Sequence, residues 1–84
     1  MNLDQAILTD HAQFQLARRH LDHADIMSVL ADPESVDTIR PGRVVAQRLI
    51  GNYLFRVFVD TDRFPPEIVT AYRSSRFQRY RKPR

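Results

Sequence analysis

Apolar residues recur at helical spacing near the start of the chain, within residues 10–20. Phe14, Ala17 and Leu21 lie three or four positions apart, so one face of a helix would carry all three. Asp10 precedes this run and is a good helix N-cap residue, because its carboxylate can accept a hydrogen bond from a free backbone N–H. The pattern predicts an amphipathic helix with these three apolar residues in the core.

A second helical pattern follows at once. Ile26, Val29 and Leu30 have the spacing of a single apolar stripe, and Asp22 stands where an N-cap is needed. Pro33 ends the segment, because the residue before a proline avoids the helical conformation. We therefore predict two short helices that pair as a hairpin over the first third of the chain.

From residue 36 onward the pattern changes to β-rich runs separated by turn residues. The predicted strands are Val36–Arg40, Arg43–Ile50, Tyr53–Asp60 and Glu67–Ser74. Pro41-Gly42 suits a type II turn, and Gly51-Asn52 suits a two-residue hairpin of type I′ or II′. Because such short links join antiparallel neighbours, we predict an α+β fold with two N-terminal helices packed on a three- to four-stranded antiparallel sheet.

Period-two alternation assigns two faces to the most apolar of these strands. One face carries Tyr53, Phe55, Val57 and Val59, and the other carries Leu54, Arg56, Phe58 and Asp60. The first set suits a core covered by the helices. The second set, in which Arg56 lies between two apolar residues, predicts a partly basic open face.

Composition narrows the class of protein. The chain has 84 residues, no cysteine and no apolar run of the roughly 18 residues that a membrane span needs. We expect one domain over residues 1–84, without a disulfide scaffold or a cysteine-based metal site. The N-terminus lacks the basic-then-apolar order of a secretory signal, so a cytoplasmic protein is expected, with no membrane partner.

The charge is divided unevenly along the chain. Residues 1–37 have a formal charge of −5 and residues 38–84 one of +8, and twelve of the thirteen bases are arginine. Guanidinium groups fit phosphate and carboxylate oxygens at two points, which indicates a polyanionic partner. The alternative is an ordinary solvated basic tail on a chain rich in arginine codons.

Three histidines lie in the helical third, and His11 is the best placed for chemistry. Histidine titrates near neutrality, so it is a natural proton donor or acceptor in phosphodiester cleavage without a metal. His11 falls in the first helical turn, with Arg18 seven positions on. The alternative is a surface histidine without a role, and His20 and His23 read as helix-end residues. No metal-binding signature is present, so no metal or cofactor is expected.

The last strand runs into the most suggestive cluster of the sequence. It interleaves arginines with aromatic rings, the combination used to bind single-stranded nucleic acid. The RNA-binding candidates of this run are Tyr72, Ser74, Arg76 and Arg79, and the same run contains Arg73 and Tyr80. The alternative is that the rings pack at the edge of the core and the arginines only aid solubility.

Four stretches of the chain resemble a known bacterial family. They are the H-A-x-x-x-x-x-x-R order of residues 11–19, V-L-A-D-P of residues 29–33, I-V-T-A-Y-R-S-S of residues 68–75, and R-Y of residues 79–80. Together they resemble the family called domain of unknown function 4258. The C-terminal part is also similar to BrnT toxins and, more distantly, to RelE-type toxins, which are ribonucleases of toxin–antitoxin pairs.

The resemblance implies a RelE/BrnT-like domain that cleaves RNA without a metal. It marks His11, Arg73 with Ser74, and Tyr80 as site residues, with His11, Arg73 and Tyr80 catalytic. Arg43 and Arg48 on the second strand are further RNA-binding correspondences, joined by Arg56 from the open face. In this hypothesis an RNA 2′-hydroxyl attacks the adjacent phosphorus, His11 moves a proton and Arg73 stabilises the charge.

Two other functions fit the same residues. A non-catalytic module could bind nucleic acid through its basic half, with affinity that falls steeply with salt. The basic surface could instead dock an acidic protein, such as a cognate antitoxin. The expected partners are therefore RNA, free or on the ribosome, and an acidic antitoxin.

Overall fold

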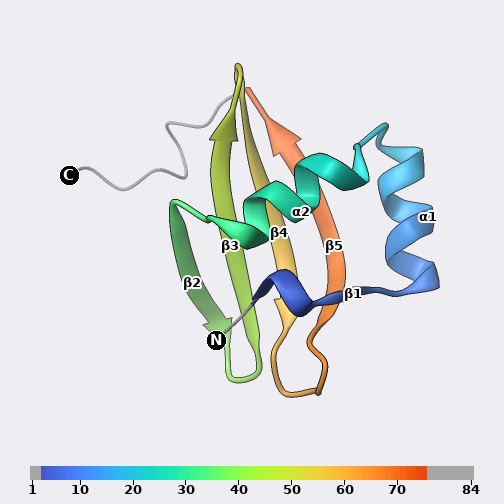
Figure 1. Ribbon diagram of the computed structural model, residues 1–84, viewed down its shortest axis with the longest axis vertical. Coiled ribbons are helices and arrows are strands. Elements are labelled where there is room, and N and C mark those ends of the chain that lie inside the picture. Colours follow the sequence, from blue (N-terminus) through green and yellow to red (C-terminus); the bar gives the residue numbers. More distant parts are fainter. Residues whose placement is uncertain (1–2, 76–84) are drawn as a thin grey trace.

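The chain folds as two helices packed on a five-stranded sheet, in a computed structural model that describes residues 3–75 (Figure 1). In chain order the elements are η1 (Leu3–Gln5), β1 (Ile7–Leu8), α1 (Asp10–Arg18), α2 (His23–Ala31), β2 (Ser35–Arg40), β3 (Arg43–Ile50), β4 (Tyr53–Asp60) and β5 (Glu67–Ser74). The strands lie in the order β1-β5-β4-β3-β2. The α+β class and the four long strands confirm the prediction from the sequence.

The two tight turns of the sheet have the predicted glycine chemistry. Gly42 has a φ of 85° between β2 and β3, as the third residue of a type II turn requires. Gly51 has a φ of 61° between β3 and β4, and Asn52 has no positive φ, which fits the type II′ alternative. The Gly51 turn aligns β3 with β4 without a break, from Arg43 opposite Asp60 to Ile50 opposite Tyr53, whereas the register of β2 against β3 shifts between Thr38 and Arg40.

The fifth strand was not predicted. β1 has only two residues and pairs parallel with β5, with Ile7 beside Glu67 and Leu8 beside Ile68. A two-residue strand shows no alternation, so no periodic pattern could mark it. Because it is so short, it covers only the first part of the free edge of β5.

Helix α1 buries a different face from the predicted one. The buried residues are Ala12 and Leu16, whereas Phe14 is 60% exposed and Ala17 is also exposed. The N-cap is Thr9 rather than Asp10, since the Thr9 hydroxyl accepts a hydrogen bond from the Ala12 N–H. The predicted Phe14/Ala17/Leu21 stripe is therefore wrong for α1, although Leu21 is buried in the loop that follows.

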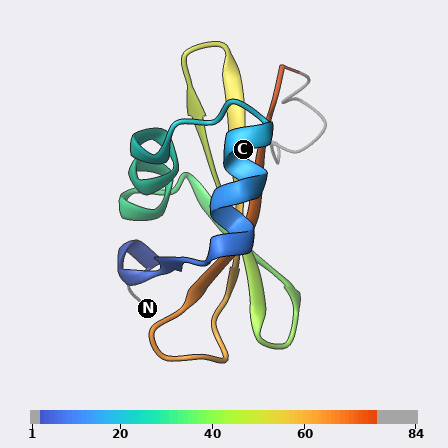
Figure 2. The same ribbon diagram turned by 90° about the vertical axis from the view of Figure 1, so that its right-hand side faces the viewer.

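Helix α1 lies beside β5, next to the edge that β1 leaves open (Figure 2). Side chains at both ends of the helix hold it there. The Thr9 hydroxyl lies 3.5 Å from the Ile68 carbonyl oxygen at one end. At the other, Arg19 donates from Nη1 to the Ala71 carbonyl at 2.7 Å and to the Thr70 hydroxyl at 3.2 Å. Unpaired strand edges expose backbone groups that need partners, and α1 supplies them here.

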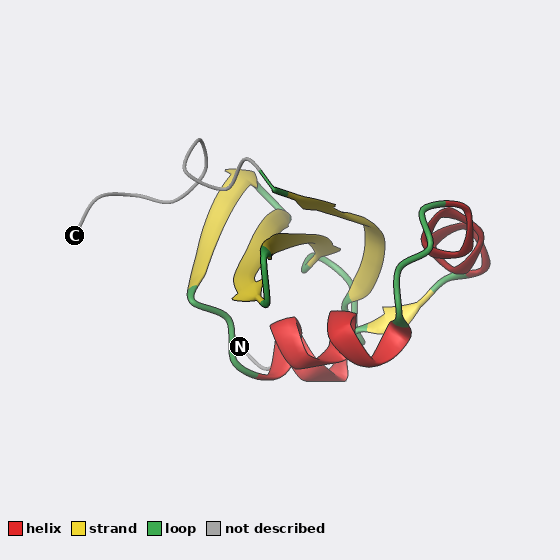
Figure 3. Cartoon of the chain, turned by 90° about the horizontal axis from the view of Figure 1, so that it is seen from above, coloured by secondary structure: helices red, strands yellow, loops and turns green. Residues whose placement is uncertain are grey.

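The helices do not form the predicted hairpin. Figure 3 shows α2 across one face of the sheet and α1 beyond its β5 side. His20, with a φ of 55°, ends α1 in the left-handed conformation and turns the chain away from its axis. Each helix therefore packs on the sheet rather than on the other helix.

Helix α2 closes the core as the sequence predicts. The Asp22 carboxylate accepts from the Ala24 N–H at the N-cap, and Ile26, Val29 and Leu30 are buried. The sheet residues in the same apolar cluster include Val44, Ala46, Phe55, Val57, Val59, Ile68 and Ala71. Tyr53 is the exception to the predicted face, because it lies at the end of β4 and is 40% exposed.

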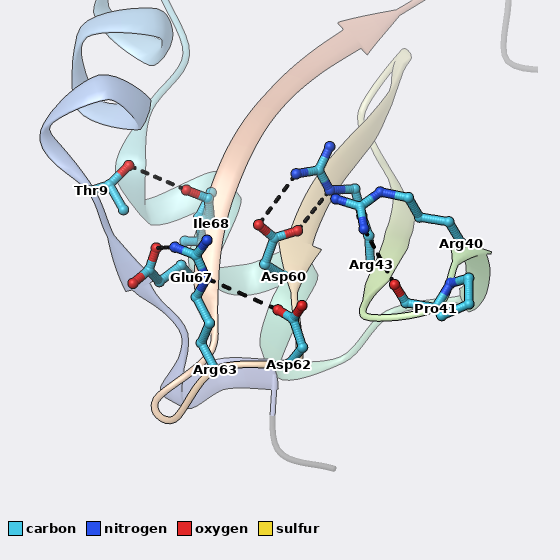
Figure 4. A network of polar contacts seen from close by, with 9 residues as sticks. All are labelled: Thr9, Arg40, Pro41, Arg43, Asp60, Asp62, Arg63, Glu67 and Ile68. Atoms are coloured by element: carbon cyan, nitrogen blue, oxygen red, sulfur yellow. Dashed lines mark hydrogen bonds and ion pairs between the residues drawn. The ribbon is translucent and has the colours of Figure 1, made fainter.

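Ion pairs connect the strand ends where β3 begins, β4 ends and β5 begins (Figure 4). Arg43 donates from Nε to Asp60 Oδ1 at 2.6 Å and from Nη2 to Oδ2 at 3.2 Å, and Arg63 donates to Glu67 at 2.8 Å. Hydrogen bonding from Arg43 lowers the pKa of Asp60 although burial opposes this, and the same bond raises the pKa of Arg43. The predicted RNA-binding residue Arg43 is thus held in a two-point ion pair within the fold.

Candidate nucleic-acid interface

Two predicted site residues, Arg48 and Arg73, are brought onto the same face of the sheet. Both stand opposite Phe55, Arg48 on β3 and Arg73 on β5, and directly paired residues point to the same side. Phe55 belongs to the core under the helices, so this is the helix-covered side. Two strand spacings place the two arginine backbones about 10 Å apart.

Arg73 is the most available of the predicted site residues. It is exposed, and its guanidinium carbon lies 4.7 Å from the ring centroid of Tyr53 on β4. Within residues 3–75 no carboxylate pairs with it. Stacking on a ring fixes the plane of the guanidinium while leaving its N–H edge for an anion.

Arg48 is anchored to the end of helix α2. Its Nη1 donates to the carbonyl oxygen of Asp32 at 2.7 Å and to the Asp32 carboxylate at 2.8 Å. Asp32 is the C-cap of α2, where the backbone carbonyls lack helical partners and the helix dipole favours a cation. Arg48 therefore stabilises α2 as well as standing at the candidate interface.

Other predicted residues lie on the opposite face of the sheet. Arg56 donates to Gln47 and to the Tyr72 hydroxyl, and its guanidinium lies over the rings of Phe58 and Tyr72. Those two rings stack with centroids 5.9 Å apart. Ser74 is on this side as well, since it pairs with Leu54. This face is a packed polar and aromatic cluster rather than a row of separate ligand contacts.

His11 and Arg73 are not brought together. His11 is exposed in the first turn of α1, whose start lies near Ile68, and Arg73 is five residues further along β5. At about 3.3 Å per strand residue the separation along the strand is roughly 16 Å. No contact between the two side chains is present among the described residues, and the start of α1 lies beside the opposite part of β5 from Arg73. Three further predicted site residues, Arg76, Arg79 and Tyr80, lie outside the described residues.

Tyr53 and Asp32 were not predicted as site residues. The signal for Tyr53 is the register of β4 against β5, because Tyr53 shares a face of β4 with Phe55 and Phe55 stands opposite Arg73. Asp32 carries no pattern signal, since its contact with Arg48 depends on where α2 crosses the sheet. Within residues 3–75, no group of three His, Asp or Glu side chains could hold a metal ion.

The comparison with known families matches most of the chain. Residues 8–73 match the family described as Domain of unknown function (DUF4258). The chain belongs to DUF4258. No curated protein and no solved structure matches it. The DUF4258 match includes Asp32, Arg48, Tyr53 and the docking residue Arg19, and it ends at Arg73, so the basic residues 76–84 follow the family region.

In the described part of the chain, no helix of this DUF4258 domain is both long and apolar enough to cross a membrane.

Proposed function

We propose that this DUF4258 domain binds single-stranded RNA at the Arg73–Tyr53 end of its sheet. The observation that carries the proposal is the exposed Arg73 guanidinium, stacked on Tyr53 and without a carboxylate partner among residues 3–75. Arginine and aromatic rings together supply phosphate contacts and a stacking surface, which single-stranded nucleic acids need. The likeness of the C-terminal part to BrnT and RelE-type toxins favours RNA over DNA.

The test is binding of a fluorescent single-stranded RNA of about 12 nucleotides, followed by anisotropy at low salt. Arg73→Ala should weaken binding about tenfold, the effect of losing one hydrogen-bonded contact to a charged group. The matched control is Arg63→Ala, which removes the same charge from an exposed arginine that is paired with Glu67. Equal affinities for wild type and Arg73→Ala would refute the proposal.

RNA cleavage is a separate proposal that rests on the likeness to ribonuclease toxins. The same RNA, incubated with excess EDTA and separated by size, reports whether the bound strand is cut. Because His11 lies at the start of α1, whose cap Thr9 is near Ile68 and roughly 16 Å along β5 from Arg73, we expect any cleavage at Arg73 to persist in His11→Ala. Binding without cut products would leave a non-catalytic module. An acidic antitoxin that competes with RNA for Arg73 would support the toxin-pair alternative.

A further inference from the structure

Arg48, Phe55 and Arg73 stand side by side on three neighbouring strands, and we call this row the rung. Arg48 is the second cation of the rung, and only its Nη1 donates hydrogen bonds to Asp32. We propose that Arg48 and Arg73 form a two-arginine clamp for RNA phosphates across Phe55, and that the Asp32 carboxylate weakens the Arg48 half of this clamp. The inference rests on the proposed RNA binding and adds a second contact to it, together with a residue that limits its affinity. The shared rung places both cations on one side of the sheet.

The donors of Arg48 leave room for an anion. A guanidinium group has five N–H donors, and both bonds to Asp32 come from Nη1. The Nε and Nη2 donors have no acceptor within the described residues, and they form the edge that binds a phosphate at two points. The Arg48 side chain is 36% exposed, so part of it is open to solvent.

Asp32 acts on Arg48 through two different groups. Its backbone carbonyl holds the guanidinium at 2.7 Å, and this bond does not depend on the side chain. Its carboxylate, at 2.8 Å from Nη1, is 82% exposed and adds a negative charge beside the place where a phosphate would bind. Exposed ion pairs contribute little to stability. Removing the carboxylate should therefore leave Arg48 in position while relieving the repulsion.

Coulomb's law gives the size by which the Asp32 charge lowers the affinity for a phosphate. A unit charge about 7 Å from a phosphate in high dielectric changes its affinity about threefold at low salt. Salt screens this contribution, so the gain should shrink as ionic strength rises. The magnitude is small enough to leave the fold intact and large enough to measure in a titration.

The experiment compares Asp32→Asn with wild type in binding the fluorescent RNA at low salt. We expect about threefold tighter binding, and no gain when Arg48→Gln is added to Asp32→Asn. The matched control is Asp62→Asn, which removes an exposed carboxylate near Arg63 at the other end of the sheet. An unchanged Tm of Asp32→Asn shows that folding does not cause its gain. For the double variant, where Arg48→Gln removes the bond to the Asp32 carbonyl, circular dichroism at the assay temperature shows that the protein is folded.

Each outcome decides between the two proposals. Wild-type binding with no gain in Asp32→Asn overturns the clamp and leaves the proposed function standing. A gain that survives Arg48→Gln overturns the assignment to Arg48. Absence of wild-type binding overturns both. Inorganic phosphate and a polyglutamate peptide serve as competitors: displacement of RNA by phosphate supports phosphate recognition, and equal displacement by polyglutamate overturns it in favour of an acidic protein ligand.

Discussion

The arginine side chains of this domain make different kinds of contact, although the sequence does not distinguish them. Arg43, Arg48 and Arg63 pair with carboxylates, and Arg19 donates to backbone and hydroxyl oxygens of β5. Arg18 and Arg73 instead lie over aromatic rings, 5.7 Å from the centroid of Phe14 and 4.7 Å from that of Tyr53. Counting bases therefore overstates the number of cations that are open to a ligand.

The Arg43–Asp60 pair makes the stability of the fold depend on pH. Asp60 has a lowered pKa in the folded state, so its contribution is complete above its unfolded pKa of about 3.9 and is lost as the pH falls through the folded value. Asp60→Asn should therefore lower Tm at neutral pH, and the difference from wild type should disappear in strong acid. Thermal unfolding followed by circular dichroism from about pH 7 to about pH 2 measures this.

The control for the pH experiment is Asp62→Asn. The Asp62 carboxylate is 58% exposed and lies 4.0 Å from Arg63, so its removal should change Tm little at any pH. A Tm difference between wild type and Asp60→Asn that stays constant across the pH range would contradict the linkage.

At the scale of elements, the sequence was informative wherever local chemistry decides the structure. Glycine turns and alternation located the four long strands, and the Asp22 cap with Pro33 located α2. The face of α1 could not be predicted in the same way. Ala12 and Leu16 are buried because α1 lies against the edge of β5, and that edge is free only because β1 stops after two residues. Such a contact between distant segments leaves no periodic trace.

The candidate site also divides into residues that local sequence identifies and residues whose contacts depend on distant segments. Arg48 and Arg73 were identified as residue types suited to phosphate, and their shared rung follows from strand register. Their partners Asp32 and Tyr53 depend on where α2 ends and on which residue closes the β3–β4 hairpin. The separation of His11 from Arg73 likewise follows from the placement of α1 along β5, which helical spacing alone does not set.

Arg19 should be the residue that holds α1 to the sheet. A nine-residue helix is marginal by itself, so its docking contacts decide whether it forms. Arg19→Ala removes the bonds to Thr70 and Ala71, and it should cost about 1 kcal/mol of unfolding free energy, since these contacts are partly exposed. Urea denaturation measures the loss, and hydrogen exchange should show faster exchange of α1 amides.

The neighbouring residue provides the control for this prediction. Arg18→Ala removes an arginine from the same helix end, but its guanidinium contacts only the exposed Phe14 ring among the described residues. We expect a change of less than about 0.5 kcal/mol. Equal effects of the two substitutions would show that the loss of a cation at the C-terminal end of α1, rather than docking to β5, accounts for the change.

Over the whole molecule, the positive charge is concentrated in the sequence that follows the family match. Residues 3–75 carry eight arginines and ten acidic residues, a formal charge of −2, whereas residues 76–84 carry five bases and no acid. The net charge of +3 is therefore an average over two unlike parts. The two parts of the sequence can therefore contribute separately to RNA affinity.

The salt dependence of RNA binding separates these contributions. The affinity falls as salt rises, and each phosphate contact to a single strand adds about 0.7 to the steepness of the slope of log affinity against log salt. Slopes here are magnitudes. Arg73→Ala should lower the slope by about 0.7, and replacing Arg76, Arg79 and Arg81 together by Gln should lower it by about 2 if each contacts one phosphate. Arg63→Gln, which removes a cation that pairs with Glu67, should leave the slope unchanged. If the triple substitution leaves the slope intact while Arg73→Ala reduces it, RNA binding belongs to the surface around Arg73 and not to the C-terminal bases. The reverse result would assign binding to those bases and remove Arg73 from the interface.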